Sequence, residues 1–177
     1  DKPANGTPKV DRGLTYADAG VDLAARHAFL GRLGQVASGA TRPEQIAGVG
    51  PFAGLFQLGS GYRNPVLVAS TDGVGTKVKL GILLERYEGL GHDSVNQNVN
   101  DALTSGAEPL FFLDYIGNTG LTDVAKLGLV RGIAEACAAV GAALLGGETA
   151  DMPDTYAAGD FDLVGFVVGV VEREAVI

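Results

Sequence analysis

The sequence has few of the residues that build disulfides, zinc centres or membrane spans. Its 177 residues include one cysteine, two histidines and no tryptophan. A single cysteine, Cys137, cannot form an internal disulfide, and His27 and His92 do not supply the Cys/His spacing of a zinc site. The apolar runs are far shorter than the ~20 residues that span a bilayer, and no charged segment precedes an apolar stretch as in a secretory signal. We therefore expect a cytoplasmic protein with no disulfide, no zinc and no membrane partner.

Positive charge is also scarce. Lysine and arginine total 13 against 21 aspartates and glutamates, which gives a formal net charge of −8 at pH 7. Proteins that bind nucleic acids gain affinity by neutralising phosphates with basic side chains, so we expect no nucleic-acid partner. An acidic protein can still bind a small phosphorylated substrate when cations bridge the negative charges.

The remaining composition is typical of a globular α/β protein. Apolar residues make up 46% and charged residues 19%, and 27 glycines are spread along the chain. A chain of this length forms one domain and buries roughly 70% of its unfolded surface. Residues 1–15 contain prolines and glycines without apolar periodicity, so we expect a mobile arm there and a domain over 16–177.

Hydrophobic spacing predicts an alternation of helices and strands. Apolar residues three and four apart indicate helices, and short apolar runs bounded by glycine or proline indicate buried strands. The predicted helices span 23–37 (capped by Asp22), 93–105 and 122–140, and the predicted strands span 55–58, 66–69, 109–115, 142–145 and 161–171. Residues 78–87 fit either element, with leucines favouring a helical turn. His27 and Cys137 fall on apolar helix faces, where we expect structural roles.

A glycine-rich segment follows the predicted strand 66–69. Its two glycines flank one small residue, which lets the backbone approach a ligand and point N–H groups into one concavity, and a threonine and a lysine add a hydroxyl and a cation. Such a segment suits phosphate, and its aspartate suits a metal nucleotide because a divalent cation must separate carboxylate from phosphate. These residues alone are also compatible with a simple strand-to-turn connection, in which the glycines serve only the backbone geometry and bind no ligand. The candidate contacts are Asp72, Gly73, Val74, Gly75, Thr76 and Lys77.

The predicted helix 93–105 has a polar face that carries short amides and acids. Five side chains gather there at helical intervals: Asp93, Gln97, Asn100, Asp101 and Thr104. A solvated face is one interpretation. The shortage of lysine and glutamate favours a second, ligation of a bound group, because solvated helical faces usually carry long charged chains.

Acidic residues also follow three of the predicted strands. Asp72, Asp114 and Glu148 each stand at a strand end near glycine or an aromatic residue, and Asp101 lies on the polar helical face. If these ends converge, the carboxylates raise one another's pKa and a cation resolves the repulsion. Magnesium fits because it takes hard oxygen ligands and commonly shares them with ATP phosphates.

Several of these segments, in this order, resemble the phosphoribosylformylglycinamidine cyclo-ligase family, also called aminoimidazole ribonucleotide synthetases, of purine biosynthesis. The resemblance runs from about Tyr16 to the end of the chain and covers the N-terminal, ATP-binding half of such enzymes, without their C-terminal domain. The segments that carry it are 18–22 (DAGVD), 71–77 (TDGVGTK), 99–101 (VND), 106–115 (GAEPLFFLDY) and 146–153 (GGETADMP).

The resemblance implies a fold, a reaction and a site. The fold is the N-terminal domain of the aminoimidazole ribonucleotide synthetase-like superfamily: α/β (α+β), with a mixed sheet, helices packed on one of its faces, and a homodimer formed through the sheet. The reaction is an ATP-dependent ring closure of formylglycinamidine ribonucleotide that releases ADP and phosphate. Magnesium would bind Asp72, Asp101 and Glu148, and Lys77 would stabilise the charge that develops on phosphoryl transfer.

Further residues enter as nucleotide-site candidates through the same resemblance. Asn100 and Asp114 are candidates for nucleotide binding, and Asp18 and Asp22 lie in a segment that folds over the nucleotide in this family. Gly34 stands where some relatives carry a lysine, so any nucleotide contact made by that lysine is absent here.

Alternatives come from proteins with the same nucleotide domain and from a non-enzyme. Selenophosphate synthetase uses a reactive residue near its N-terminus, which this chain lacks, whereas thiamine monophosphate kinase and the amidotransferase of the preceding purine step match the segment 146–153 less well. The alternative that is not an enzyme is a module that binds magnesium–ATP and dimerises without catalysing a reaction.

Overall fold

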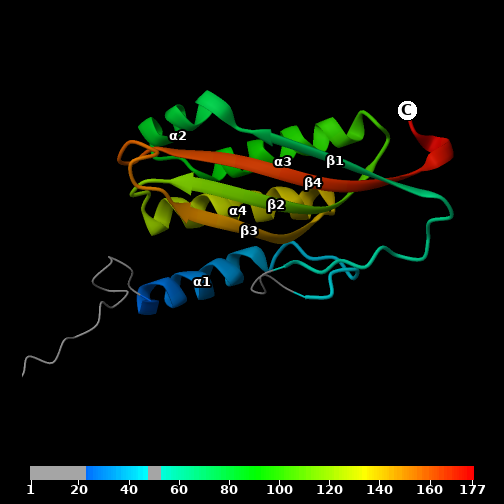
Figure 1. The fold of residues 1–177 in the computed structure, drawn as a ribbon, viewed down its shortest axis with the longest axis horizontal. Coiled ribbons are helices and arrows are strands. Elements are labelled where there is room, and N and C mark those ends of the chain that lie inside the picture. Colours follow the sequence, from blue (N-terminus) through cyan, green and yellow to red (C-terminus); the bar gives the residue numbers. More distant parts are fainter. Residues whose placement is uncertain (1–22, 48–52) are drawn as a thin grey trace, which may run out of the picture.

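A mixed four-stranded sheet organises the structure, a computed structural model that describes residues 23–47 and 53–177 (Figure 1). The strands lie in the order β1-β4-β2-β3. Strand β4 is antiparallel to both of its neighbours, and β2 and β3 are parallel. The strand bounds are β1 Pro65–Gly73, β2 Glu108–Asn118, β3 Ala143–Asp151 and β4 Phe161–Glu172.

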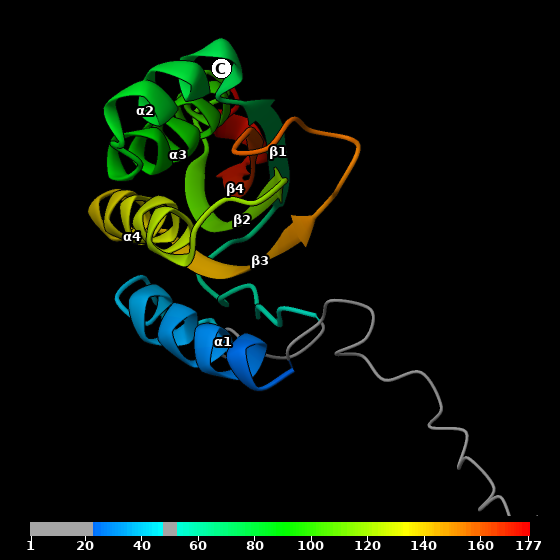
Figure 2. The ribbon, with the colours of Figure 1, turned by 90° about the vertical axis from the view of Figure 1, so that its left-hand side faces the viewer.

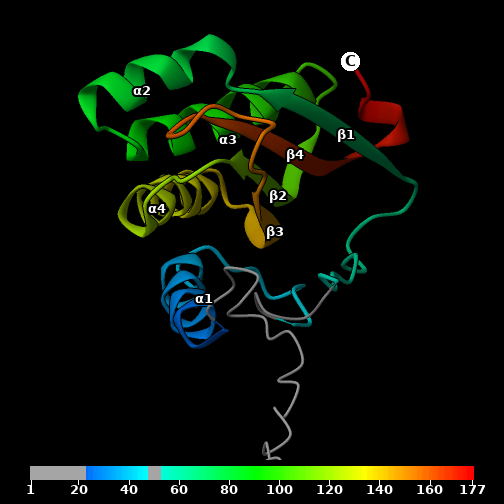
Figure 3. The ribbon, with the colours of Figure 1, turned by 60° about the vertical axis from the view of Figure 1, so that its left-hand side comes forward.

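Of the four α-helices in the described residues, three lie on one side of this sheet (Figure 2). Helices α2, α3 and α4 share that side, and α1 lies next to α4, below the edge strand β3 (Figure 3). The helix bounds are α1 Leu23–Ala37, α2 Val78–Leu84, α3 Glu88–Leu103 and α4 Asp123–Val140, with the short 3-10 helices η1 Gly75–Lys77 and η2 Arg173–Ala175. The predicted α/β class, with a mixed sheet and helices on one face, is confirmed.

The hydrophobic core lies between α3, α4 and the helix-facing side of the sheet. Alternate residues of β2 and β4 point into it, because successive side chains of a strand point to opposite faces. Phe112, Ile116, Leu163 and Val167 are fully buried there. Burying side chains of this size stabilises the fold by roughly 1.5–3 kcal/mol each.

Local signals set the ends of the best-defined helix. The side chain of Thr122 accepts a hydrogen bond from the Ala125 amide over 3.2 Å and caps the N-terminus of α4. Gly141 ends the helix in the left-handed conformation, at φ 72°, which glycine adopts without steric cost. The predicted helix 122–140 is confirmed.

The other face of the sheet is only partly covered. Leu67 of β1 is 62% exposed and Phe166 of β4 is 37% exposed on this face. Phe56 packs against Phe111 of β2, with ring centroids 5.1 Å apart, and covers one part of it. On the rest of this face, over β1 and β4, no helix among the described residues covers the sheet (Figure 2).

The structure corrects several predicted elements. Residues 55–58 do not form a strand of the sheet: Phe56 makes a single bridge to Gln45, and the preceding Gly54 lies against Leu145. Residues 78–87 are helical over Val78–Leu84. Helix α3 begins at Glu88, five residues before the predicted start at 93, because its first turn packs on α4.

Two side chains lie on the opposite side of their helices from the prediction. His27 is exposed, because α1 packs on the rest of the protein through Leu33, Val36 and Ala37 nearer its C-terminus. Leu103, predicted for the apolar stripe of α3, is 49% exposed, whereas Cys137 is buried as predicted. The predicted cap Asp22 and the arm 1–15 lie outside the described residues.

Candidate nucleotide and metal site

The glycine-rich segment is shorter as a loop than its sequence indicates. Strand β1 continues through Asp72 to Gly73, and only Val74 separates it from the helical stretch that starts at Gly75. Gly75 has φ +69°, and nothing lies within 4 Å of the position where a Cβ would stand. The prediction that the strand ends before Asp72 is therefore wrong, because the ladder with β4 extends to the pair Gly73–Val164.

The amide groups that follow Gly73 leave room for an anion. Gly75, Thr76 and Lys77 are exposed, and η1 runs directly into α2. The first N–H groups of a helical stretch have no partner within it, so they are free to donate outward. The Val74 amide, in contrast, donates to the Leu163 carbonyl over 2.9 Å, which fixes the segment to β4.

Lys77 is already placed by a charged partner. Its Nζ donates to Asp93 Oδ2 on α3 over 2.8 Å, with about half of the lysine side chain (54%) exposed. An exposed ion pair of this kind contributes about 0–1 kcal/mol, so the lysine can exchange partners at little cost.

Asp72 and Asp101 lie along the same seam between β1 and α3. Both residues are exposed. The hydroxyl of Ser70 donates to Asp101 Oδ2 over 3.0 Å. The Nδ2 of Asn98, on α3, donates to the carbonyl oxygen of Asp72 over 3.3 Å. The predicted pair of carboxylates therefore shares one side of the sheet, although a metal bound by them stays a prediction.

Asp114 lies in a register row that crosses all four strands. Asp72 pairs with Gly165, Gly165 with Asp114, and Asp114 with Gly147. Its carboxylate occupies the space that a side chain at Gly147 would need. Gly147 on the neighbouring strand β3 thus makes room for an acid on the helix-facing side of the sheet.

Burial changes the chemistry of this acid. Burial first, and then the neighbouring Glu148 carboxylate, raise the pKa of Asp114 from 3.8 to about 7, against the opposing effect of a backbone hydrogen bond. Burial, with Asp114 as a further cause, also raises the pKa of the Cys137 thiol, so this cysteine is an inert core residue. Nucleotide binding by Asp114 stays a prediction.

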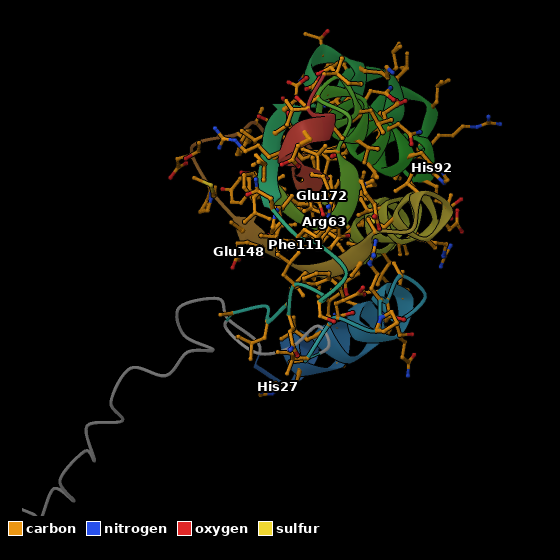
Figure 4. All side chains as sticks on the ribbon, turned by 90° about the vertical axis from the view of Figure 1, so that its right-hand side faces the viewer. His27, Arg63, His92, Phe111, Glu148 and Glu172 are labelled. Atoms are coloured by element: carbon orange, nitrogen blue, oxygen red, sulfur yellow. The ribbon has the colours of Figure 1, made fainter. Side chains whose placement is uncertain are left out.

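Glu148 lies on the other face of the sheet from Asp72. It pairs with Tyr115, one position after Asp114, and neighbouring strand residues point to opposite faces. Figure 4 shows Glu148 on the side away from the helix that carries His92. Within residues 23–47 and 53–177, no three His, Cys, Asp or Glu side chains gather as metal ligands. The role of Glu148 as a magnesium ligand stays a prediction.

The remaining candidates differ in what the structure says of them. Asn100 is exposed on α3, next to Asp101, as its position on the polar face indicated. Asp18 and Asp22 lie outside the described residues. A shallow surface pocket lies between α1 and α4, and none of the candidate residues that the structure describes lines it; its lining residues are Val36, Gly39, Arg131, Ala134, Glu135 and Ala138.

Two polar residues of α3, Asp93 and Asn98, were not identified from the sequence as contacts of the candidate site. Asp93 was assigned to the polar face without a partner, and Asn98 was not singled out, although it stands directly beside the apolar Val99. An amide next to the apolar stripe of a helix is a signal for a buried polar contact, because buried amides require hydrogen-bond partners.

Comparison with known proteins gives a family and a fold. Residues 53–171 match the family described as AIR synthase related protein, N-terminal domain. The chain is 52% identical over 164 residues to the phosphoribosylformylglycinamidine cyclo-ligase of Gloeobacter violaceus, a match that covers 93% of this chain and 49% of the relative. The chain thus spans about half the length of the curated relatives it matches.

Two solved structures share the fold at low identity. Thiamine-monophosphate kinase from Stenotrophomonas maltophilia K279a has a TM-score of 0.65 at 21% identity, over 85% of this chain and 43% of that chain. Hydrogenase maturation protein HypE in complex with ATP has a TM-score of 0.61 at 16% identity, over 86% and 42%. None of the helices in the described parts of the chain is long and apolar enough to cross a membrane.

Proposed function

The chain belongs to the AIR synthase related protein family through its N-terminal domain, and we propose that it is the nucleotide-binding half of a phosphoribosylformylglycinamidine cyclo-ligase. The whole enzyme would close the imidazole ring of aminoimidazole ribonucleotide from formylglycinamidine ribonucleotide, with ATP converted to ADP and phosphate. The observation that carries the proposal is the 52% identity over 93% of this chain to one half of such an enzyme. The purine pathway and the cytoplasm are the setting we expect for it.

The structure supports ATP as the nucleotide by the placement of groups. The backbone amides of the exposed residues Gly75 and Thr76 and the ammonium of Lys77 lie together at the end of β1. HypE, which shares the fold, has a solved structure in complex with ATP. Phosphoryl transfer needs positioning and electrostatic stabilisation more than a protein nucleophile, and these groups supply both.

Asp72 and Asp101 fit magnesium by their chemistry. Both offer exposed carboxylate oxygens on the β1–α3 seam. Magnesium is usually held by one or two carboxylates together with substrate phosphates and water, so a cluster of three protein acids is not required. A bound magnesium ion would neutralise phosphate charge, while Asp72 and Asp101 hold it and Lys77 stabilises charge on the transferred group.

The substrate and the oligomer are further parts of the proposal. Formylglycinamidine ribonucleotide would be held between this half and the second half of the enzyme, which supplies the groups that orient it. A homodimer would form through the open face of the sheet, where Leu67 and Phe166 are exposed. Large apolar side chains exposed on one face of a sheet are the kind of surface that a protein–protein interface covers.

The experiment measures aminoimidazole ribonucleotide formation with ATP, magnesium and substrate, for the chain alone and after addition of the separately expressed C-terminal half of the Gloeobacter relative. We expect turnover only with both halves, because orientation of the substrate, worth up to ~7–11 kcal/mol in well-placed systems, is missing from one half. Turnover by this chain alone near the full-length rate would contradict the proposal.

A second candidate is a magnesium–ATP-binding dimerisation module without turnover. The features that fit this candidate are the exposed side chains of Leu67 and Phe166 and the exposed residues Gly75, Thr76 and Lys77, which would serve dimerisation and nucleotide binding and do not by themselves require turnover. Magnesium-dependent ATP binding without any turnover, when the second half is present and folded, would support this candidate against the enzyme.

A further inference from the structure

Asn98 is a buried amide with an unusual set of contacts. Its side chain is fully buried on α3. Its Nδ2 donates to the Asp72 carbonyl over 3.3 Å and to the Ser94 carbonyl, one turn earlier on the same helix, over 2.8 Å. Both partners are carbonyl oxygens, which only accept hydrogen bonds, so the orientation of the amide is fixed.

Within residues 23–47 and 53–177, the oxygen of this amide has no hydrogen-bond partner. Asn98 Oδ1 and the neighbouring Ser94 Oγ are both buried and unpaired. A buried polar atom without a partner destabilises the fold, and an apolar side chain at this position avoids that cost. The asparagine therefore weakens the core, and its contact with Asp72 offsets that weakness.

The sheet is shaped to admit the amide. A Cβ at Gly165 would lie 2.6 Å from Asn98 Nδ2 and 2.9 Å from Ser94 Oγ. Gly165 is also the ladder partner of Asp72. The absence of a side chain at this one point of β4 lets an amide from α3 reach past β4 to the end of β1.

The contact lies where it can control the candidate site. Asp72 is the penultimate residue of β1, and its carboxylate accepts from the Gly73 amide over 2.8 Å. One helical turn along α3, Asp101 accepts from Ser70 of the same strand. The two contacts, three residues apart on the helix, hold the end of β1 at two points.

We propose that Asn98 is a positioning residue, which fixes the backbone of Asp72 and thereby aims the Asp72 carboxylate and the following glycine segment at a metal-bound nucleotide. That the ligand is a metal-bound nucleotide rests on the proposed function. The hydrogen bond from Asn98 on α3 to the Asp72 carbonyl does not depend on it. Asn98 touches neither nucleotide nor metal in this role, since it is fully buried.

The test is the variant Asn98→Leu, which keeps the branching of the side chain and removes both the donor and the unpaired oxygen. Its matched control is Ser94→Ala, which removes the other unpaired oxygen one turn away without touching Asp72. Asn98→Ala provides a smaller replacement if leucine disturbs packing. Each protein is titrated with a non-hydrolysable ATP analogue, with and without magnesium, and its melting temperature is measured.

We expect Asn98→Leu and Asn98→Ala to weaken magnesium-dependent binding of the analogue about tenfold, while magnesium-free binding changes less than twofold. Asn98→Leu should melt at or above the wild-type temperature. Ser94→Ala should bind as the wild type does. If Asn98 only stabilised the fold, its replacement would lower the melting temperature and the affinity together. A variant that keeps its melting temperature but loses affinity therefore indicates that Asn98 positions Asp72.

Amide hydrogen exchange gives a readout that needs no ligand. Exchange at Gly73 and Val74 should be faster in Asn98→Leu than in the wild type or in Ser94→Ala. Unchanged exchange together with unchanged magnesium-dependent affinity would overturn the inference. If the wild type itself binds no magnesium nucleotide, the proposed function fails. In that case faster exchange at Gly73 in Asn98→Leu still supports the inference that Asn98 holds the backbone of Asp72, and unchanged exchange overturns that inference.

Discussion

Lys77 and Asp93 connect the glycine-rich segment to α3, through a hydrogen bond of 2.8 Å from Nζ to Oδ2. The lysine is thereby held beside the exposed amides that precede α2, before any ligand arrives. Because this ion pair is exposed, it adds little to stability. The main effect of this ion pair is to fix the position of the Lys77 ammonium group.

Replacement of Lys77 by methionine should weaken nucleotide binding about tenfold or more, because a charged hydrogen bond to phosphate contributes ~1.5–3 kcal/mol. The melting temperature should change little. The control is Lys79→Met, which removes a similar exposed pair to Asp160, of 2.6 Å. Calorimetric titration with an ATP analogue measures both. Equal losses in the two variants would mean that Lys77 acts only through general charge.

Replacement of Asp101 by asparagine should weaken magnesium-dependent nucleotide binding about tenfold and leave the fold intact. The asparagine can still accept the hydrogen bond from Ser70, so only the charge is lost. Glu88→Gln removes one charge from the first turn of the same helix, where Glu88 pairs with Arg131, and serves as control. If titration shows unchanged magnesium dependence in Asp101→Asn, Asp101 belongs to a solvated face.

Asp114 should make the protein less stable as pH rises. Its folded pKa of about 7 lies above the unfolded value of 3.8, so between these values the folded state binds more protons and the free energy of unfolding falls with increasing pH. Asp114→Asn lacks this term. Relative to that variant, the wild type should lose on the order of 4 kcal/mol between pH 4 and pH 8, because the pKa rises from 3.8 to about 7 and each unit contributes about 1.4 kcal/mol.

Urea unfolding of both proteins at several pH values checks this expectation, and comparison with Asp114→Asn cancels the opposite contributions of Glu44 and Glu172, whose pKa values are lowered. Parallel stability curves for the two proteins would show that Asp114 ionises normally.

Gly132→Ala should destabilise the fold by more than 2 kcal/mol, because a Cβ at Gly132 would collide with the Glu88 carbonyl where α3 and α4 cross. The matched control is Gly31→Ala in α1, where nothing lies within 4 Å of the added Cβ. That variant should stabilise by about 0.5–1 kcal/mol, as alanine does in a helix interior. Thermal unfolding measures both, and equal effects would contradict the close crossing.

Phe166→Asp and Leu67→Asp should convert a dimer into a monomer, because a charge in the centre of an apolar interface is left without a partner. Leu83→Asp, at a residue of α2 that is 77% exposed on the helix side, is the control. Light scattering at micromolar concentration gives the masses. A wild-type monomer, or a dimer that also dissociates in Leu83→Asp, would rule out the open face as the interface.

Features that depend only on neighbouring residues could be predicted from the order of the amino acids. Helix α1 spans the predicted residues 23–37, and α4 starts at its Thr122 cap and ends at Gly141, as local capping chemistry requires. The glycine-rich segment and the acids could also be found in the sequence, because their chemistry is carried by residue type and spacing.

Which candidate residues share a face of the sheet depends on strand pairing between distant parts of the chain. Strand β1 reaches Gly73 because β4 supplies a ladder partner there, so Asp72 became a strand residue. In β3, the register skips Leu145 between the pairs Phe112–Leu144 and Leu113–Gly146. Such a bulge shifts every later side chain by one position and so to the other face. Without the bulge, Glu148 would stand opposite Ile116, on the side of Asp72. With it, Glu148 pairs with Tyr115 and points away. Gly146 and Gly147 are compatible with a bulge at this point, but only the pairing of β3 with β2 decides which residue the register skips.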